Sequence, residues 1–252
     1  MLILRRLSGI RKGAGIAVKG GVNLRLFFGS VRYSEDMDLD GTSQAADAIR
    51  ASIIGMFEDR AFTRHLQMFG IRELDPGEGP NKDTETTFRY KFGVVVAGAI
   101  RYPTKVEVSF RGRHEADRLV SEAVQPEILR AYGMDGLEVR HYVREAAVRQ
   151  KLDALGGRRE AQARDVFDLH VLVSDSAPDT LVHFLAKHLA HSRLKEAHAR
   201  ALAITYAEYQ GQVFEFLSDD ARAQYGTENV WDDMRLRAAA LIETVLELQE
   251  RT

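Results

Sequence analysis

The fold of this chain is decided by two adjacent stretches, Gly15-Ile-Ala-Val-Lys-Gly-Gly-Val-Asn-Leu-Arg-Leu-Phe-Phe28 and Arg32-Tyr-Ser-Glu-Asp-Met-Asp-Leu39. Residues 15–18 have the length and apolar character of a buried strand, and residues 22–28 have the spacing of a helix. Gly20 and Gly21 stand between them, where the absence of a side chain lets the backbone approach a ligand closely. The first stretch therefore predicts a strand, a glycine turn and a helix.

The second stretch alternates acidic and apolar residues, which predicts a strand with Asp36, Asp38 and Asp40 on one face. Glu107 lies between two valines on a later expected strand. Carboxylates at i and i+2 point the same way, and a third from a neighbouring strand can complete an oxygen cage for Mg²⁺. Such acids repel each other unless a cation neutralises them. Taken alone, the D-x-D pattern is a weak signal, and it fits a solvated strand edge as well as a metal site at Asp36, Asp38 and Glu107.

The rest of the chain divides into a mixed half and a helical half. In the first half we expect a long or broken helix at residues 43–69, a loop at 75–80, and two strands at 86–99 and 102–110. In the second half we expect helices at residues 126–132, 144–155, 161–173, 180–189, 194–217 and 230–250. One short extended piece is expected at residues 137–142. We therefore predict an α+β fold: a mixed sheet with flanking helices at residues 1–122, and an all-helical domain at 123–252 that packs against it and completes the active-site cleft.

Composition restricts the class of protein. The 252 residues are 45% hydrophobic and 29% charged and include no cysteine. These values are typical of a globular chain, and they exclude disulfides, thiolate metal sites and cysteine nucleophiles. No apolar run approaches the ~20 residues of a membrane helix, and the N-terminus has no signal-peptide pattern. We expect a cytoplasmic protein without membrane contact.

The net charge of −2 conceals an uneven distribution. The first 34 residues include no acidic side chain but seven basic ones: Arg5, Arg6, Arg11, Lys12, Lys19, Arg25 and Arg32. A second basic set lies around residue 151, at Arg140, Arg144, Arg149, Arg158, Arg159 and Arg164. Basic sectors suit phosphates or nucleic acid, because lysine and arginine replace condensed counterions there. The alternative is an ordinary solvated cationic surface.

The segment from Lys19 to Phe28, followed by Arg32 to Leu39, resembles the signature of the AbiEii/AbiGii toxin family, within the DNA polymerase β-like nucleotidyltransferase superfamily. The resemblance implies a nucleotidyltransferase-type mixed sheet, in which a K-G-G turn starts a helix and an R-x-S-x-D-h-D segment supplies two metal-binding acids. Asp36 and Asp38 match these acids, and Glu107 is the candidate for the third. The implied nucleotide-binding residues are Lys19, Gly20, Gly21, Arg32, Ser34 and Lys151.

Two segments of the helical half add to the resemblance. Glu145 to Leu155 and Arg164 to Leu169 look like the family's A-x-K-x-x-A-L and R-D-x-x-D-L segments. By this match Lys151 and Asp165 join the catalytic set, with Lys151 neutralising triphosphate charge and Asp165 orienting Lys151 or the nucleotide. Without the resemblance, a helical lysine would be read as a solvated charge and Asp165 as a surface pair or helix cap.

The resemblance implies a Mg²⁺-dependent enzyme, with Mn²⁺ as a substitute, that transfers NMP from an NTP to an acceptor and releases pyrophosphate. It further implies the toxin of a toxin–antitoxin or abortive-infection system, with a cognate antitoxin as partner and RNA, specifically the 3′ end of tRNA, as the acceptor. The alternative function is that of a degenerate fold, without catalysis, that binds a nucleotide, RNA or a partner protein.

Overall fold

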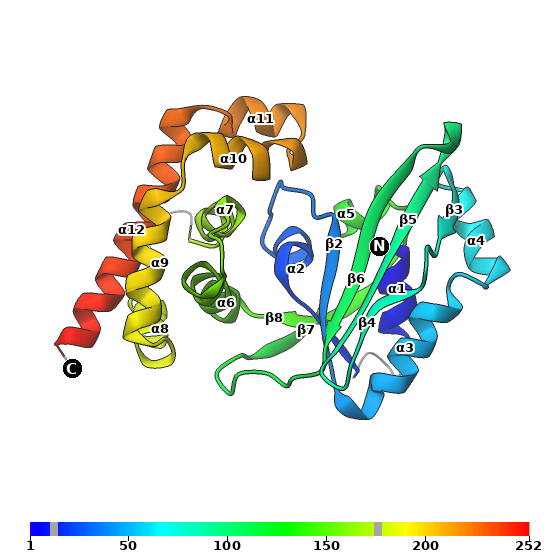
Figure 1. The fold of residues 1–252 in the computed structure, drawn as a ribbon, viewed down its shortest axis with the longest axis horizontal. Helices are drawn as coiled ribbons and strands as arrows, with labels where there is room; N and C mark the ends of the chain where they lie inside the picture. The colour runs from blue at the N-terminus through cyan, green and yellow to red at the C-terminus, as the bar shows by residue number, and fades with distance from the viewer. Residues whose placement is uncertain (11–14, 174–177, 252) are drawn as a thin grey trace. The chain divides into compact units, whose positions relative to one another are not determined.

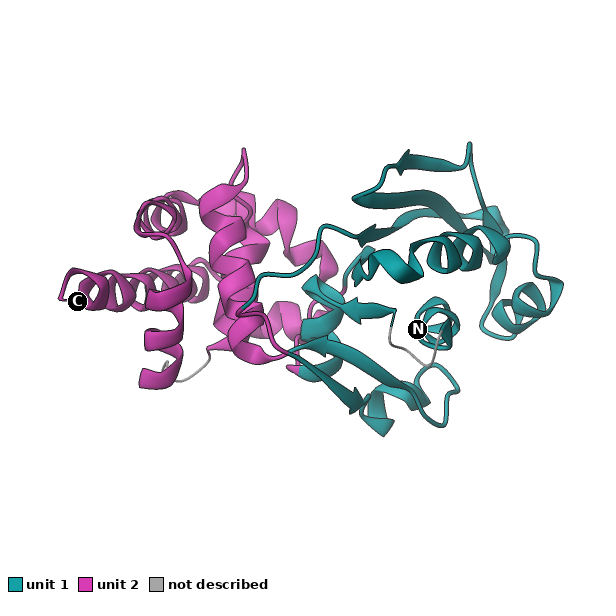
Figure 2. Cartoon of the chain, turned by 90° about the horizontal axis from the view of Figure 1, so that it is seen from below, with its two compact units in different colours: residues 1–27, 34–115, 119–142 teal, residues 28–33, 116–118, 143–252 magenta. Residues whose placement is uncertain are grey.

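The structure is a computed structural model that describes residues 1–10, 15–173 and 178–251. Arg11 and Lys12 of the first basic sector lie outside these residues. The chain divides into two compact units, coloured separately in Figure 2. Unit 1 comprises residues 1–27, 34–115 and 119–142, and unit 2 comprises residues 28–33, 116–118 and 143–252. The expected domain boundary at residue 122 falls inside a strand of unit 1.

Unit 1 has the mixed α and β content expected of the N-terminal half. Its elements, labelled in Figure 1, are α1 (Leu2–Ser8), β1 (Ile16–Val18), α2 (Gly20–Phe27), β2 (Asp36–Gly41), η2 (Ser43–Ala45), α3 (Ala46–Gly55), α4 (Arg60–Gln67), β3 (Ile71–Asp75), β4 (Pro80–Asp83), β5 (Thr87–Val96), η3 (Ala97–Ala99), β6 (Arg101–Ser109), β7 (Leu119–Ala123), α5 (Pro126–Arg130) and β8 (Glu138–Tyr142).

The strands of unit 1 form one mixed sheet. Within the described residues its order is β3-β5-β6-β2-β1-β8-β7, with β4 also paired to β5. The central pair, β2 and β6, is parallel, whereas β1 and β2 are antiparallel, as are β5 and β6. The strand of acids therefore lies between β1, which leads into the glycine turn, and β6, which holds Glu107.

Alternation along the strands separates an apolar face of the sheet from a charged one. Leu39, Phe88, Val106 and Val108 are fully or almost fully buried in the core of unit 1. Helices α1 and α3 lie on this side of the sheet, and α2 lies on the other side (Figure 1). Burial of this apolar face stabilises unit 1 and obliges the intervening residues of β2, β5 and β6 to point to the opposite face.

The structure refines the expected elements of unit 1. The helix expected at 43–69 is broken, and Asp59 begins its last part by accepting hydrogen bonds from the N–H groups of Ala61 and Phe62. The loop expected at 75–80 is the turn between β3 and β4, two short strands that the sequence did not predict. Strand β7 was also not predicted. These strands are mostly polar and partly exposed, and their partners β5 and β8 determine their conformation.

The regular elements that the structure describes in unit 2 are all helices, as expected for the C-terminal half. Its elements are α6 (Arg144–Gly157), α7 (Ala163–Leu172), α8 (Asp179–His188), α9 (His191–Ala203), α10 (Tyr206–Gln212), η4 (Phe214–Phe216), α11 (Asp219–Tyr225) and α12 (Glu228–Glu250). The helix expected at 194–217 is interrupted where Thr205 and Glu208 form a capping box that starts α10. The buried Trp231 stacks on Tyr209, with ring centroids 4.6 Å apart. No helix among the described residues is long and apolar enough to cross a membrane.

Gly156 provides a test of the packing of unit 2. A Cβ atom at Gly156 would contact the Arg193 carbonyl oxygen of α9 and would lie 3.2 Å from the Ala197 nitrogen. We expect Gly156→Ala to lower the free energy of unfolding by about 1–3 kcal/mol, because the helix backbones must separate. Gly211→Ala in α10 is the matched control, since a Cβ atom there would have no atom within 4 Å apart from the backbone of its own helix. Equal urea midpoints for the two variants would contradict this packing.

Candidate active site

The charged face of the sheet places acids and bases in rows across three strands. In the β2–β6 register, Asp36, Asp38 and Asp40 lie opposite Lys105, Glu107 and Ser109. In the β5–β6 register, Lys91 lies opposite Lys105, and Arg89 lies opposite Glu107. The two strand pairings therefore bring together the acids that the sequence predicted and add basic residues that it did not.

Three of the four carboxylates on this face have a cationic partner. Lys105 Nζ lies 2.7 Å from Asp36 Oδ2, and Arg89 Nε lies 2.5 Å from Glu107 Oε2. Asp40 pairs with Lys19 at 2.6 Å and also accepts a hydrogen bond from the Tyr142 hydroxyl. Asp38 differs from these three: among the described residues, its carboxylate has no ion-pair or hydrogen-bond partner.

The glycine turn lies directly against Asp38. The Lys19 N–H donates a hydrogen bond to the Asp38 carbonyl oxygen at 3.1 Å, which fixes the turn to β2. Gly20 begins α2 with a φ of +62°, and a Cβ atom there would lie 3.2 Å from Asp38 Oδ2. A side chain at this position would be strained and would crowd the carboxylate. Gly21 follows as the second residue of the helix. The turn therefore leaves open the space beside Asp38.

The environment shifts the acids of this face in opposite directions. Burial is the largest effect on Asp38 and raises its pKa. The positive charges of Lys19 and Lys105 oppose this shift, and the negative charges of Glu107 and Asp36 add to it. Burial also acts to raise the pKa of Glu107, but the hydrogen bond and positive charge of Arg89 outweigh it and lower the pKa. Of these two acids, Asp38 is therefore the one whose charged form the protein disfavours.

The donor set on this face fits a magnesium site of limited coordination. No group of three or more histidine, aspartate or glutamate side chains forms a metal cluster in the described part of the chain, and the Glu107 carboxylate is turned to Arg89. Asp36 and Asp38 nevertheless stand at i and i+2 on one face of β2. Proteins bind Mg²⁺ through one or two carboxylates completed by water and substrate phosphates. These two acids satisfy that requirement without a third protein ligand.

Arg32 and Ser34 have structural partners. The Ser34 hydroxyl donates a hydrogen bond to the Asp36 carbonyl oxygen at 2.9 Å and so shapes the start of β2. Arg32 belongs to unit 2, where its guanidinium donates to both oxygens of Asp168 at 3.1 Å. Only 6% of the Arg32 side chain is exposed, so this arginine is held inside unit 2.

Unit 2 brings Lys151 and Asp165 together in a buried charge network. Lys151 Nζ lies 3.0 Å from Asp165 Oδ1 and 2.5 Å from Asp168 Oδ2. Both aspartate side chains are completely buried, and Arg158 pairs with Asp165 from the rim at 3.1 Å. Burial acts to lower the pKa of Lys151, but the charges of Asp168 and Asp165 outweigh it and raise the pKa. Lys151 is therefore held as a cation in a fixed position.

Sequence reasoning missed three partners of the site: Asp168, Lys105 and Arg89. Asp168 could have been found, because it follows Asp165 by three residues in a predicted helix and so shares its face. The two basic residues belong to strands of the same face, but only the strand register shows which acid each one meets.

Many of the predicted basic-sector residues are engaged inside the units. Arg149 makes a bidentate pair with Asp117 at 2.7 Å, and Arg6 pairs with Asp59 at 2.6 Å. Arg144 donates to the Leu172 carbonyl oxygen and lies over the Phe28 ring. These side chains, together with Lys19, Arg32 and Arg158, already neutralise or hydrogen-bond groups of the protein.

Solved structures of other proteins are similar to this chain in fold. The nucleotidyltransferase toxin MenT4 from Mycobacterium tuberculosis is 18% identical, with a TM-score of 0.56 over 98% of this chain and 90% of that chain. JHP933 from Helicobacter pylori is also 18% identical, with a TM-score of 0.54 over 99% of this chain and 90% of that chain. A putative nucleotidyltransferase from H. pylori has 18% identity and a TM-score of 0.52, covering 99% and 92%. At this identity the likeness shows the fold.

The family itself is shown by sequence. A search of curated proteins found no match. In contrast, residues 2–237, nearly the whole chain, match the family described as the nucleotidyl transferase AbiEii toxin of type IV toxin–antitoxin systems. This chain therefore belongs to the AbiEii toxin family and is a nucleotidyltransferase.

Proposed function

We propose that this enzyme is a Mg²⁺-dependent toxin that transfers NMP from an NTP to the 3′ end of an RNA, with tRNA as the preferred acceptor. In the proposed reaction the acceptor 3′-hydroxyl oxygen forms a bond to the α-phosphorus. The bond from that phosphorus to the bridging oxygen of the β-phosphate breaks, and pyrophosphate leaves with the electron pair. The hydroxyl proton passes to a carboxylate. The toxin family implies an NTP substrate and a cognate antitoxin.

The observation that supports this function best is the uncompensated charge of Asp38 beside the glycine turn. Unlike Asp36, Asp40 and Glu107, Asp38 has no direct ion pair among the described residues, and burial raises its pKa although Lys19 and Lys105 act against that shift. A site that keeps such a charge beside an open backbone turn is suited to a divalent cation and the phosphates that it carries. Asp36 and Asp38 would hold Mg²⁺, or Mn²⁺ in its place, which would neutralise the developing charge on the transferred phosphoryl group.

The turn itself would hold the triphosphate. Helix α2 begins at Gly20 and has no acidic residue in its first turn. The N–H groups at a helix start are good donors to phosphate oxygens, and glycine allows those oxygens to come close. Lys19 adds a positive charge at the same place, 2.6 Å from Asp40. We assign triphosphate binding to Lys19, Gly20 and Gly21, with Ser34 supporting the start of β2.

Glu107 would act as the third acid of the site. Its carboxylate is held by Arg89 through one oxygen and lies in register with Asp38. In this position it would accept the proton of the attacking hydroxyl and complete the metal surroundings with its other oxygen. Arg89 keeps Glu107 ionised, because its hydrogen bond and charge lower the pKa of Glu107.

Lys151 and Asp165 are the proposed catalytic residues of unit 2. Lys151 would offset triphosphate charge, and Asp165, together with Asp168 and Arg32, would fix its position. The network supports this role because it keeps Lys151 protonated and nearly immobile. A rigid cation loses less entropy when it binds phosphate than a free surface lysine does.

An RNA acceptor is supported by exposed cations close in sequence to Glu107. Arg111 and Arg113 follow β6, both are exposed, and neither has an ion pair among the described residues. A phosphate backbone uses several such contacts. Several arginines of the two basic sectors are paired within the protein. Arg111 and Arg113 are therefore the better candidates for contacts with RNA phosphates.

Asp38→Asn tests the metal site. We expect this change to weaken Mg²⁺-dependent NTP binding in calorimetry and to lower NMP transfer by a factor on the order of 10²–10³, comparable to loss of a key electrostatic group. The melting temperature should stay level or rise, because an uncompensated charge is removed. Asp135→Asn, at an exposed acid of unit 1, is the control. Undiminished transfer by Asp38→Asn would refute the metal role.

Gly20→Ala tests the role of the glycine turn in NTP binding, and Gly70→Ala is the matched control for backbone strain. Both glycines have positive φ, +62° and +75°, but only Gly20 has Asp38 within van der Waals reach. Each alanine should cost about 1–2 kcal/mol of stability through the left-handed backbone. Only Gly20→Ala should also reduce NTP affinity and transfer. A similar loss of activity in both variants would show that strain alone is responsible.

The acceptor can be identified by label transfer. The protein is incubated with Mg²⁺, each α-³²P-NTP, and either total cellular RNA or total cellular protein. We expect label at the 3′ ends of RNA, predominantly tRNA, and a steep loss of RNA binding as salt rises, because phosphate contacts displace counterions. Label restricted to the protein fraction at every salt concentration would exclude the RNA acceptor.

A further inference from the structure

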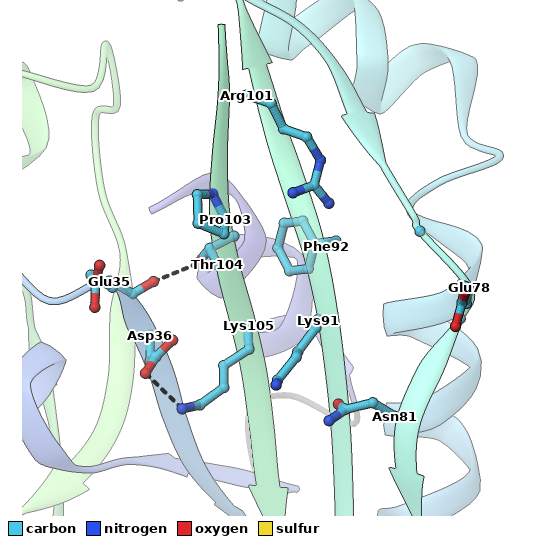
Figure 3. Close-up of a pocket in the computed structure, with 12 residues that line it drawn as sticks. Glu35, Asp36, Glu78, Asn81, Lys91, Phe92, Arg101, Pro103, Thr104 and Lys105 are labelled. Carbon is cyan, nitrogen blue, oxygen red and sulfur yellow. Dashed lines mark hydrogen bonds and ion pairs between the residues drawn. The ribbon is translucent and has the colours of Figure 1, made fainter.

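A pocket of about 490 Å³ opens in unit 1 beside Asp36 (Figure 3). It lies among β2, β4, β5 and β6, and its charged or polar lining includes Asp36, Asn81, Lys91, Arg101 and Lys105. One wall is the turn between β3 and β4, where Gly77 and Gly79 present backbone. This turn belongs to the Asp75 to Pro80 loop of the sequence analysis, which the proposed function leaves unused.

Two lysines meet at the floor of this pocket. Lys91 and Lys105 are directly opposite each other in the β5–β6 register, and in Figure 3 they extend side by side between Asp36 and Asn81. Like charges in opposite positions of a sheet are destabilising. Lys105 has Asp36 at 2.7 Å, whereas Lys91 is exposed and has no ion pair in the described part of the chain. Lys91 is therefore the unpaired lysine of the two, and an anion between them would relieve their repulsion.

Three further charged residues line the pocket: Glu35, Glu78 and Arg101. In Figure 3 Glu78 lies apart from the two lysines. Arg101 is paired with Asp75 at 2.7 Å, so its charge is compensated at the wall. The Glu35 carboxylate points away from the two lysines in Figure 3, and the Glu35 carbonyl oxygen accepts the Thr104 hydroxyl. The Asn81 side chain adds a donor and an acceptor near Lys91. The pocket thus combines two neighbouring lysines, one of them unpaired among the described residues, with hydrogen-bonding groups and an open backbone wall.

The strand order separates this pocket from the glycine turn. The turn leaves β1 on one side of β2, whereas β6, β5 and β4 lie on the other side. Asp36 lines the pocket, and Asp38, two residues later, touches Gly20. If the donor triphosphate occupies the turn, the attacking hydroxyl has to reach the α-phosphorus from the opposite side, because displacement at phosphorus is in line. The pocket lies on that side.

We propose that this pocket binds a nucleotide unit of the acceptor RNA strand, with a phosphate of the strand between Lys91 and Lys105. The inference rests on the proposed function and adds the place where the acceptor is recognised. The volume lies within the range of sites that enclose small organic ligands, so it accommodates one nucleotide unit and not a duplex. Lys91 and Asn81 are thereby binding residues for the acceptor, distinct from the donor residues at the turn.

Two variants of different chemistry test the pocket in the full-length chain. Lys91→Ala removes the unpaired cation, and Asn81→Trp fills the pocket without changing the charge. The probe is a 5′-fluorescein-labelled single-stranded RNA with a free 3′-hydroxyl, followed by anisotropy. We expect Lys91→Ala to weaken binding on the order of tenfold and to reduce the salt slope by about one. Asn81→Trp should weaken binding without that change in slope, and Mg²⁺–NTP affinity should remain at the wild-type value in both.

Lys195→Ala, an exposed lysine of α9, is the charge control and should leave RNA affinity unchanged. Unfolding is monitored by melting for every variant. If both pocket variants fold and bind RNA like wild type, the acceptor pocket is refuted while the transferase function stands. If either folded variant loses NTP affinity instead, the pocket belongs to the donor and the inference is also refuted. Failure of the wild-type chain to transfer NMP to any acceptor would instead refute the proposed function.

Discussion

The parallel pairing of β2 with β6 is the constraint on which the candidate site depends. It sets Asp38 opposite Glu107 and Asp36 opposite Lys105, and the antiparallel pairing of β5 then adds Arg89 and Lys91 to the same rows. A shift of one residue would turn all these charges into the apolar core and expose the buried face. Because Leu39, Val106 and Val108 are buried on the other face, the core itself enforces this register. Fold stability and site geometry therefore have the same cause.

Within this register, the distribution of counter-charges distinguishes the acids by role. Asp36, Asp40 and Glu107 are each neutralised by a neighbouring base, so the protein tolerates them without a ligand. Asp38 has no such direct partner among the described residues, and burial raises its pKa even though the charge of Lys19 opposes the shift. A bound cation would relieve that cost. Because Mg²⁺ held by one or two carboxylates is completed by substrate phosphates, metal binding would be coupled to the binding of phosphate. Most ion pairs of the charged face of the sheet are thus already formed without a ligand, and Asp38, beside the glycine turn, is the acid without one among the described residues.

The sequence predicted the local parts of this arrangement and not the distant ones. The strand, the glycine turn, helix α2 and the acids of β2 follow from residues within one short segment, and the structure has them as expected. The partners Lys105, Arg89 and Lys91 depend on which strands pair and in which register, and such information is not local. The short strands β3, β4 and β7 were not predicted for the same reason. Their polar residues have a weak propensity for strand, and pairing with β5 or β8 supplies their hydrogen bonds.

The buried charge network of unit 2 also joins residues that are far apart in the sequence, so no local pattern predicts it. Lys151, Arg32, Asp165 and Asp168 are all largely removed from water, at a desolvation cost that their attraction recovers only when the geometry is good. Apolar residues of similar size often serve stability equally well, so stability alone gives little reason to keep four charges there. What apolar residues cannot supply is a lysine kept protonated in one orientation. The raised pKa of Lys151 and the lowered pKa of Asp168 are the consequences expected of a network that fixes a cation. In the proposed function, this fixed cation would offset the negative charge of the triphosphate.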